Sequence, residues 1–379
     1  MKLELNDQQK MIKKMVKEFA EKHIAPFAAE LDQKEEYPTK ILKEMAKLGL
    51  LGIIIPTEYG GAGLDTISYA TVIEEISRKC SSTGVITSVH NSLVSHPIMK
   101  YGTEEQKKKY LTILAKGEEI GAFAATEPNA GSDLGAMQTT AVLKGNKYII
   151  NGDKTFITSG PEAGIIIVFA VTNKEAGSKG ISAFIVEDSF KGYKVGSIFE
   201  KLGINASKTS ELIFEDMEVP KENLLGKEGE GFKIALSTLD GGRIGIAAQA
   251  VGIARAALDE SIEYAKQRQQ FGRPLAKFQA IQWMIADMAT RIEAARYLVY
   301  NASYLKDKGE RFSKEAAMAK LYASETAMDA VIKAVQIHGG YGYTKEYAVE
   351  RLFRDAKITE IYEGTSEIQR LVISGSLLK

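Results

Sequence analysis

Residues 279–305 read QAIQWMIADMATRIEAARYLVYNASYL, a stretch without proline. It is one of three long segments of helical character in the last third of the chain, together with Ala247–Arg268 and Lys314–His338. All eight prolines lie at or before Pro274, so the last 105 residues contain none of these helix breakers. Three or four such helices predict an antiparallel bundle over residues 226–379.

The sequence before this bundle divides into two regions with different residue patterns. Residues 122–225 contain short runs rich in β-branched residues and bounded by turn residues, which predicts strands. These runs are Thr139–Leu143, Tyr148–Ile150, Gly164–Val171, Ile181–Val186 and Ser210–Phe214. Between Gln8 and His23 the apolar residues recur with a 3.6-residue period, and residues 1–121 are mostly helical in pattern. We therefore predict a mostly α protein with a central β domain, divided into residues 1–121, 122–225 and 226–379.

Composition limits the classes of protein to consider. The chain has 379 residues, 45% of them hydrophobic, which suffices for two or three domains. Lysine plus arginine and aspartate plus glutamate each total 49, so no basic excess indicates a nucleic-acid partner. The most apolar stretch, Gly164–Val171, is too short to span a bilayer, and residues 1–23 lack the apolar core of a signal peptide. The single cysteine, Cys80, fits a reducing compartment, so we expect a cytoplasmic protein without membrane insertion.

Several common catalytic motifs are absent from the sequence. No GxGxxG follows a strand, and no GxxxxGK[ST], HExxH or GxSxG occurs. With four histidines and one cysteine, we expect no metal site. The kinase, metalloprotease and hydrolase classes are therefore disfavoured.

Two segments of the β region contain chemistry-bearing residues. Residues 123–133, FAATEPNAGSD, combine small residues that allow a ligand close to the backbone with the hydroxyls of Thr126 and Ser132. An ordinary turn is the alternative for this segment. Residues 154–159, KTFITS, place an aromatic ring beside hydroxyls, which suits a flat ring system. A plain strand is the alternative there, and taken alone it is the better interpretation.

Three further segments lie in the helical region. Residues 239–243, LDGGR, hold two glycines that suggest close approach of a ligand or a helix, although Asp240 and Arg243 are also consistent with a surface ion pair. Residues 267–275, QRQQFGRPL, put an arginine at a helix end, where it suits a phosphate or is simply solvated. Residues 336–343, QIHGGYGY, form either a helix cap or a set of amides for an anion.

The sixth segment, residues 361–369, reads IYEGTSEIQ. Its Glu363 lies between a tyrosine and a glycine and follows apolar Ile358 and Ile361. A carboxylate in an apolar pocket has a raised pKa and becomes a useful base, whereas most lone glutamates lie on the surface.

Taken together and in this order, the six segments resemble the acyl-CoA dehydrogenase family over essentially the whole chain. The specific parts are TEPNAGSD, FITS, LDGGR, RQQFGRPL, QIHGGYGY and IYEGTSEIQ. The likeness is to the bacterial short-chain branch that acts on butyryl-CoA. The resemblance implies a helical N-terminal domain, a middle β-barrel or sandwich and a C-terminal four-helix bundle. It also implies FAD between the β domain and the bundle, and a homotetramer.

The resemblance further implies roles for single residues. Glu363 would remove the α proton of the thioester while hydride leaves the β carbon for flavin N5, giving a trans-2-enoyl-CoA. The implied cofactor-binding residues are Phe123, Ala125, Thr126, Gly131, Ser132, Phe156, Ile157, Thr158, Arg268, Phe271, Gln279, Gln336, Gly339, Gly340, Thr365 and Glu367. The implied substrate-binding residues are Ser132, Asp240, Gly241, Arg243 and Gly364. In this family the groups corresponding to Arg268, Gln279 and residues 336–340 come from a neighbouring subunit.

The position of the base distinguishes branches of the family. Some relatives place it in the segment corresponding to LDGGR, where this chain has Gly242, whereas Glu363 occupies the location used by short- and medium-chain members. We expect electrons to pass to an electron-transferring flavoprotein. Two alternatives remain: the same site working as a crotonyl-CoA reductase with a bifurcating flavoprotein, and a catalytically inactive flavin- or acyl-CoA-binding protein. The intact Glu363 argues against the second.

Overall fold

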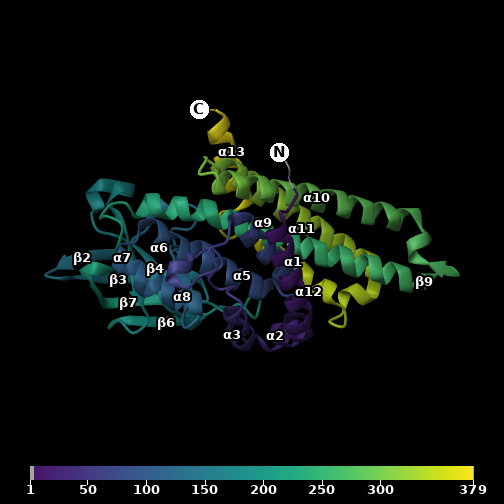
Figure 1. Cartoon of the computed structure of the whole chain (residues 1–379), viewed down its shortest axis with the longest axis horizontal. Helices are drawn as coiled ribbons and strands as arrows, with labels where there is room; N and C mark the ends of the chain where they lie inside the picture. The colour runs from purple at the N-terminus through teal and green to yellow at the C-terminus, as the bar shows by residue number, and fades with distance from the viewer. Residues whose placement is uncertain (1–3, 379) are drawn as a thin grey trace.

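Long helices dominate the C-terminal part of the computed structural model, which describes residues 4–378. In Figure 1, α9, α10 and α11 extend along the long axis of the molecule, and the shorter α13 projects from it near the C-terminus. The bounds of the C-terminal elements are α9 Gly231–Gln267, β9 Gln269–Gln270, β10 Arg273–Pro274, α10 Gln279–Asp307, α11 Ser313–His338, α12 Ala348–Ile358 and α13 Ser366–Leu377. The predicted helical bundle is thereby confirmed.

The N-terminal part is also helical, as predicted. Its helices are α1 Asp7–Phe19, α2 Ala28–Lys34, α3 Thr39–Lys47, α4 Thr66–Ser77, α5 Ser81–Val89, α6 His96–Tyr101, α7 Glu104–Gln106 and α8 Thr112–Lys116. Local signals set several of their ends. The side chain of Asn6 accepts a hydrogen bond from the Gln9 N–H and the Gln9 side chain bonds back, a capping box that begins α1. Asp65 caps α4 through the Ser68 N–H.

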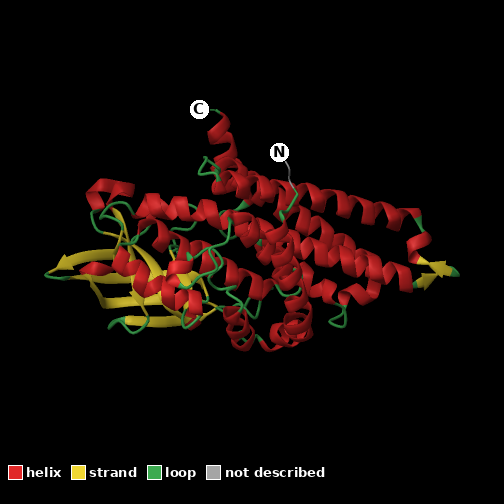
Figure 2. Ribbon diagram, in the orientation of Figure 1, coloured by secondary structure: helices red, strands yellow, loops and turns green. Residues whose placement is uncertain are grey.

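The central β domain forms one mixed sheet, which Figure 2 shows in yellow at one end of the molecule. Its strands are β1 Ile120–Ala124, β2 Thr140–Lys144, β3 Lys147–Thr158, β4 Ala163–Val171, β5 Ile181–Glu187, β6 Tyr193–Ile198, β7 Thr209–Pro220 and β8 Leu224–Leu225. The strand order is β6-β7-β3-β2-β4-β5-β8, and β1 pairs with β4 in parallel.

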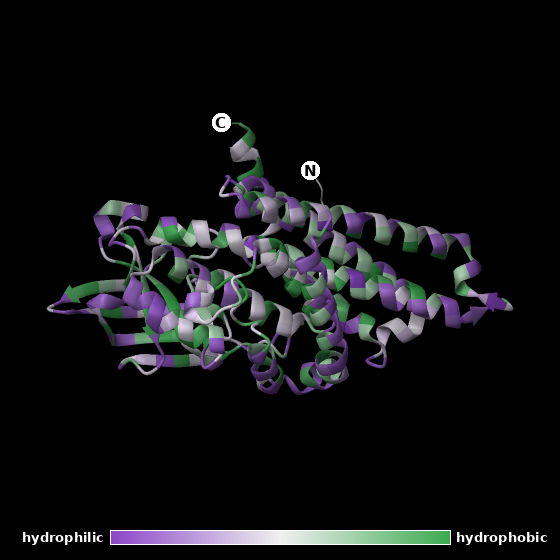
Figure 3. Cartoon of the chain, in the orientation of Figure 1, coloured by the Kyte–Doolittle hydropathy of each residue, from purple (hydrophilic) through white to green (hydrophobic). Residues whose placement is uncertain are grey.

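The sheet folds over a core of its own. The rings of Tyr148 on β3 and Phe184 on β5 have centroids 4.9 Å apart, although β2 and β4 lie between these strands in the sheet order. Two intervening strands would separate the rings by about 14 Å in a flat sheet, so the sheet must curl. The outer face of β4 packs against the N-terminal helices through Ile165, Ile167 and Phe169. In Figure 3, hydrophobic strand segments contrast with helices on which hydrophilic and hydrophobic residues alternate.

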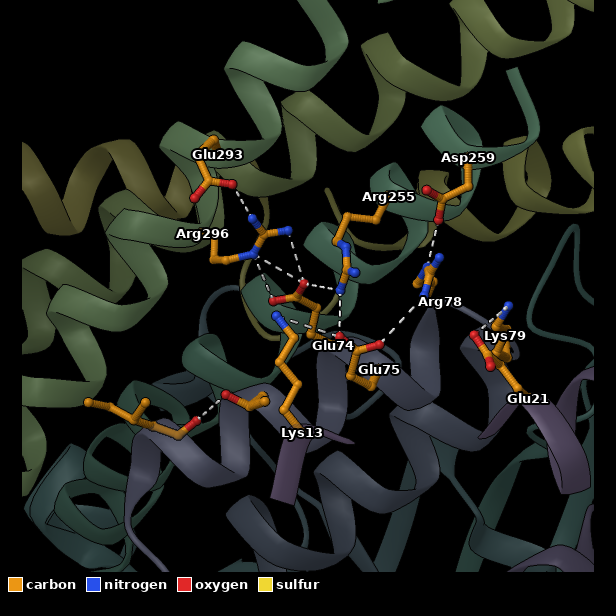
Figure 4. A network of polar contacts seen from close by, with 12 residues as sticks. Lys13, Glu21, Glu74, Glu75, Arg78, Lys79, Arg255, Asp259, Glu293 and Arg296 are labelled. Atoms are coloured by element: carbon orange, nitrogen blue, oxygen red, sulfur yellow. Dashed lines mark hydrogen bonds and ion pairs between the residues drawn. The ribbon is translucent and has the colours of Figure 1, made fainter. Parts of the chain in front are cut away.

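A buried ion cluster ties the N-terminal helices to the bundle (Figure 4). Glu74 on α4 is 3% exposed and pairs with Arg255 of α9 at 2.5 Å and with Arg296 of α10 at 3.1 Å. Arg255 also reaches Glu75 at 2.7 Å. Because removal of one member would leave a buried charge unpaired, this cluster specifies how α4, α9 and α10 pack.

Two elements of the structure extend beyond the bounds that the sequence predicts. Helix α9 begins at Gly231, whereas the prediction began it at Ala247, so the LDGGR segment lies inside a helix. Each glycine costs helix stability, but a Cβ at Gly245 would lie 2.2 Å from Tyr69 Oη and one at Gly252 would lie 2.5 Å from Glu74 O. The glycines therefore allow neighbouring helices to approach closely. Strand β3 continues to Thr158, beyond the predicted end at Ile150.

The exact domain boundaries after residues 121 and 225 stay predictions, and residues 1–3 and 379 of the outer predicted domains lie outside the described residues. Among the helices described, none is both long and apolar enough to cross a membrane.

Candidate active site

The predicted base lies in a strained turn between α12 and α13. Glu363 has φ +52° and Gly364 has φ +97°, both in the left-handed region. That conformation costs a non-glycine residue about 1–2 kcal/mol, and such strain is concentrated at functional sites. Thr365 then caps α13, because its hydroxyl accepts a hydrogen bond from the Ile368 N–H at 3.4 Å.

Two side chains from different helices hold this turn. Lys320 of α11 donates from Nζ to the Gly364 carbonyl at 2.7 Å. Gln369 of α13 donates from Nε2 to the same carbonyl at 2.8 Å and to the Glu363 carbonyl at 3.3 Å. These donors offset part of the backbone strain and determine where the Glu363 side chain points.

The Glu363 carboxylate is buried and unpaired. Neither of its oxygens has a hydrogen-bond partner among residues 4–378. A Cβ at Gly242 would lie 2.1 Å from Oε2 and 2.7 Å from Leu93 Cδ2, so the carboxylate occupies the space that the missing side chain of α9 leaves. An apolar cluster surrounds this region, consisting of Val85, Val89, Leu93, Ile204 and Ile246 with Phe123, Leu239, Ile358 and Tyr362 against it.

These surroundings bring the ionisation of Glu363 toward neutral pH. Burial raises its pKa from 4.5 to about 8, and the positive charges of Lys320 and Arg243 oppose part of that rise. A pKa near the working pH lets a carboxylate accept a proton and release it again. The Glu363 carboxylate therefore lies in an apolar pocket and not on the surface, while its role as the base stays a prediction.

The LDGGR segment faces the same region from α9. Arg243 is 5% exposed and donates to Asp240 at 2.5 Å, and Asp240 also accepts a hydrogen bond from the Ser313 hydroxyl. The alternative of a plain surface ion pair is therefore wrong for Arg243. An added Cβ at Gly241 would lie 3.2 Å from Lys306 Nζ, so this glycine faces the end of α10.

The two segments of the β domain lie against each other. The Thr155 N–H donates to the Thr126 carbonyl at 2.9 Å. Lys154, fully buried, pairs with Glu127 at 2.8 Å and also donates to the Ala125 carbonyl at 3.3 Å. Glu127 in turn accepts from the Gln138 and Thr139 N–H groups. This pair fixes the 123–133 loop to β3.

Within these segments, exposure differs from residue to residue. Phe156 is 64% exposed with φ +57°, whereas Ile157 is 2% exposed. Gly131 and Ser132 are exposed, and Phe123 is partly buried and contacts the cluster near Glu363. The exposed ring of Phe156 lies on β3, whose neighbouring residue Thr155 bonds the 123–133 loop, and such a ring can cover one face of an aromatic cofactor.

A second predicted group surrounds a pocket at the other end of the bundle. This pocket has a volume of about 560 Å³, and Arg268, Gln336, Gly339 and Gly340 are among the residues that line it. Tyr264, His338 and Tyr341 also line it, and the rings of Tyr264 and His338 stack at 4.2 Å. A guanidinium group, stacked rings and glycine backbone together fit the phosphate and base of a nucleotide.

One chain does not bring all predicted cofactor residues together. The pocket that Arg268 lines lies next to β9, at the end of the molecule opposite the β domain (Figure 1). Phe271 is 93% exposed at the tip of the β9–β10 hairpin, and neither it nor Gln279 is among the residues lining the pocket. Thr365 and Glu367 lie at the start of α13, beside Glu363.

The sequence analysis missed Lys320, Gln369 and the Lys154–Glu127 pair. For Lys320 a signal existed, because Ala316, Ala323 and Ala327 share its stripe on α11 and are fully buried. A lysine inside an apolar helical stripe requires a polar partner. Gln369 belongs to the IYEGTSEIQ segment itself, whereas Lys154 and Glu127 lie far apart in sequence and no local pattern relates them.

Comparison with known proteins agrees with this arrangement. Residues 6–118, 122–217 and 229–378 match the acyl-CoA dehydrogenase N-terminal, middle and C-terminal domains, respectively. The short-chain specific acyl-CoA dehydrogenase of Clostridium acetobutylicum is 57% identical over 379 residues, which is 100% of both chains. The acryloyl-CoA reductase (NADH) of Anaerotignum propionicum is 52% identical over 100% of this chain and 96% of its own.

Solved structures show the same fold. Butyryl-CoA dehydrogenase from Megasphaera elsdenii superposes with a TM-score of 0.98 at 49% identity, covering 100% of each chain. A chain in a structure of the electron transferring flavoprotein of Acidaminococcus fermentans, work directed at flavin-based electron bifurcation, superposes with a TM-score of 0.99 at 56% identity, again over 100% of each chain.

Proposed function

Because this chain belongs to the acyl-CoA dehydrogenase family, we propose that it oxidises short-chain acyl-CoA thioesters such as butyryl-CoA to trans-2-enoyl-CoA. The single observation that supports this best is the Glu363 carboxylate, buried without a partner in an apolar space above Gly242.

The chemistry requires a base placed next to a weakly acidic C–H bond. Glu363 takes the α proton of the thioester onto a carboxylate oxygen as hydride leaves the β carbon. The developing enolate oxygen needs a hydrogen-bond donor. The Glu363 backbone N–H has no acceptor among the described residues, which leaves it available for that oxygen. The base and an oxyanion donor thus come from the same turn.

FAD is the cofactor that the family implies, and when bound it supplies the hydride acceptor. We assign its flavin end to Phe123, Ala125, Thr126, Gly131, Ser132, Phe156, Ile157, Thr158, Thr365 and Glu367. The pocket of Arg268, Gln336, Gly339 and Gly340 would hold the phosphate and adenosine end from a neighbouring copy, with Phe271 and Gln279 nearby. The separation of the two groups within one chain supports an oligomer, and we propose a homotetramer.

Substrate contacts are assigned to the other side of the same turn. We propose that Ser132, Gly241, Arg243 and Gly364 contact the thioester and its CoA arm together with Asp240. The burial of the Arg243–Asp240 pair next to Glu363 supports this assignment. A cytoplasmic location stays a prediction.

The reverse reaction, reduction of an enoyl-CoA, is the second candidate function. Acryloyl-CoA reductase (NADH) of Anaerotignum propionicum is 52% identical to this chain, and the same two proton and hydride positions serve reduction of an enoyl-CoA. The likeness to a chain in the electron transferring flavoprotein structure supports an electron-transferring flavoprotein as partner in either direction. The physiological direction then depends on that partner.

Anaerobic titration with butyryl-CoA tests the proposal. The purified protein, saturated with FAD, should show a flavin absorption band that bleaches when butyryl-CoA is added. Glu363→Gln should keep the band and lose the bleaching. Octanoyl-CoA and branched thioesters rank the substrates, and a larger kcat/KM for octanoyl-CoA would refute the short-chain assignment. Bleaching by none of these thioesters in the wild-type protein would refute the oxidative function.

Light scattering tests the assembly. A homotetramer has four times the mass of the 41.4 kDa chain. A monomeric mass in the FAD-saturated protein would contradict the proposed sharing of the cofactor between copies.

A further inference from the structure

Lys320 is buried in a place where packing does not require a charge. Its side chain is 0% exposed, within an alanine-rich stripe of α11. No carboxylate of the described chain forms a hydrogen bond with its Nζ, and its one hydrogen bond goes to the Gly364 carbonyl at 2.7 Å. An alkyl side chain of similar length would fill the same volume without the cost of burying an ammonium group.

That hydrogen bond reaches the turn that carries Glu363. Gly364 follows Glu363 directly, and both have positive φ. Because the ammonium group holds the Gly364 carbonyl, it limits rotation of the peptide unit next to the base. Gln369, which follows the turn on α13, donates to the same carbonyl. The turn is therefore held by one side chain from α11 and one from α13.

The ammonium group also acts on the Glu363 carboxylate through space. Among the groups around this carboxylate, Lys320 and Arg243 lower its pKa and burial raises it. The phenols of Tyr362, in the same turn, and Tyr69, on α4, also lie close enough to interact with its charge. Lys320 itself interacts with Glu360 and Glu367 on the neighbouring segments, and burial lowers its pKa to about 8.

We propose that Lys320 is a positioning residue for Glu363, whose ammonium group holds the Glu363–Gly364 turn in its reactive conformation and brings a positive charge to the turn that carries the carboxylate. This inference rests on the proposed function, in which Glu363 removes the substrate proton. Among the described residues around Glu363, Gln369 bonds the turn but is neutral, and Arg243 is charged but bonds Asp240 and not the turn.

The test compares Lys320→Met, which removes the donor and the charge at similar volume, with Lys333→Met as a control. Lys333 is on the same helix and pairs with Asp329 at 2.7 Å, away from Glu363. Stopped-flow measurement of flavin reduction by butyryl-CoA across pH gives one readout. Infrared difference spectra of the carboxyl band, assigned with Glu363→Gln, give the ionisation midpoint of Glu363 without turnover.

For Lys320→Met we expect flavin reduction at pH 7 to slow by about tenfold to a hundredfold. The midpoint of Glu363 ionisation should rise by about one pH unit or more, and the pH profile of flavin reduction should shift in the same direction. Lys333→Met should match the wild type in both. If Lys320→Met does not fold, Lys320→Gln serves, since it removes the charge and keeps a donor, and the same rise in midpoint is expected.

An unchanged midpoint in a folded Lys320 variant would overturn the proposal, as would a slower reaction with an unchanged pH profile, because that pattern indicates a purely structural role. The infrared midpoint is independent of turnover. If the wild-type protein reduces no flavin with any thioester, the proposed function fails, and the midpoint still decides whether Lys320 controls Glu363.

Discussion

Glu363→Gln should stabilise the folded protein while it abolishes proton abstraction. Burial raises the pKa of Glu363 from 4.5 to about 8, so folding favours the protonated carboxyl group. In the unfolded chain this group ionises near its ordinary pKa. Between those two values the unfolded state therefore binds fewer protons, and stability falls as pH rises. Glutamine resembles the protonated acid in shape and carries no charge to bury.

The expected magnitude follows from the difference in pKa. At pH 7 the folded carboxyl group is kept protonated about 2.5 units above its ordinary pKa, which costs about 3.5 kcal/mol at about 1.4 kcal/mol per unit. At pH 5 the cost falls below about 1 kcal/mol. For a chain of 379 residues, about 3.5 kcal/mol corresponds to a rise in Tm of about 4 °C. The amide of glutamine and the protonated carboxyl group of glutamate both lack hydrogen-bond partners at this site. The difference in stability between the variant and the wild type therefore comes mainly from ionisation.

Differential scanning calorimetry of the FAD-saturated protein at pH 5 and pH 7 measures the effect, at one scan rate. Glu346→Gln is a suitable control, since the Glu346 side chain is exposed in the folded chain. The reasoning is refuted if the Tm of Glu363→Gln exceeds that of the wild type by the same amount at both pH values, or if it is lower at pH 7.

Three further changes test the site. Gly242→Ala places a Cβ 2.1 Å from the Glu363 carboxylate. Flavin reduction by butyryl-CoA should therefore slow by about a hundredfold while the circular dichroism spectrum stays unchanged. A wild-type rate in this variant would contradict the packing of Glu363 against Gly242. Glu127→Gln leaves the buried Lys154 ammonium group without its anionic partner. The free energy of unfolding measured with denaturant should fall by about 3–5 kcal/mol, and FAD should bind less tightly. An unchanged denaturation midpoint would show that the pair is dispensable. Arg268→Ala removes the guanidinium group from the second pocket, so flavin content after gel filtration should drop, and full retention would argue against a phosphate there.

Much of the fold is predictable because its signals are local. The 3.6-residue period of residues 279–305 and 314–338 depends only on neighbours along the chain, and α10 and α11 appear within two residues of the predicted bounds. The strands around Val168 and Phe184 follow from β-branched runs between turns. The start of α9 was missed because its glycines are unfavourable locally, and only contacts with α4 and α5 make them acceptable.

The candidate site divides in the same way. The resemblance to the family implies that Glu363 and the position of Gly242 are the two places at which a base can lie, but it gives no distance between them. Their contact, with the carboxylate against the bare α-carbon, appears only when α9 and the turn before α13 are packed together. The roles assigned to the individual cofactor- and substrate-binding residues stay predictions, and for Gln279 and the Arg268 pocket a single chain does not complete the site.

The sequence by itself determined the family, the helical and β regions and the identity of the candidate base, because periodicity and ordered motifs are properties of the linear chain. Only the tertiary structure decided that the Glu363 carboxylate is buried and unpaired, that Lys320 and Gln369 hold its turn, and that the Arg268 pocket lies at the far end of the bundle. The physical reason is that pKa, strain and pocket shape depend on groups distant in sequence, whose electrostatic and packing effects exist only once the chain is folded.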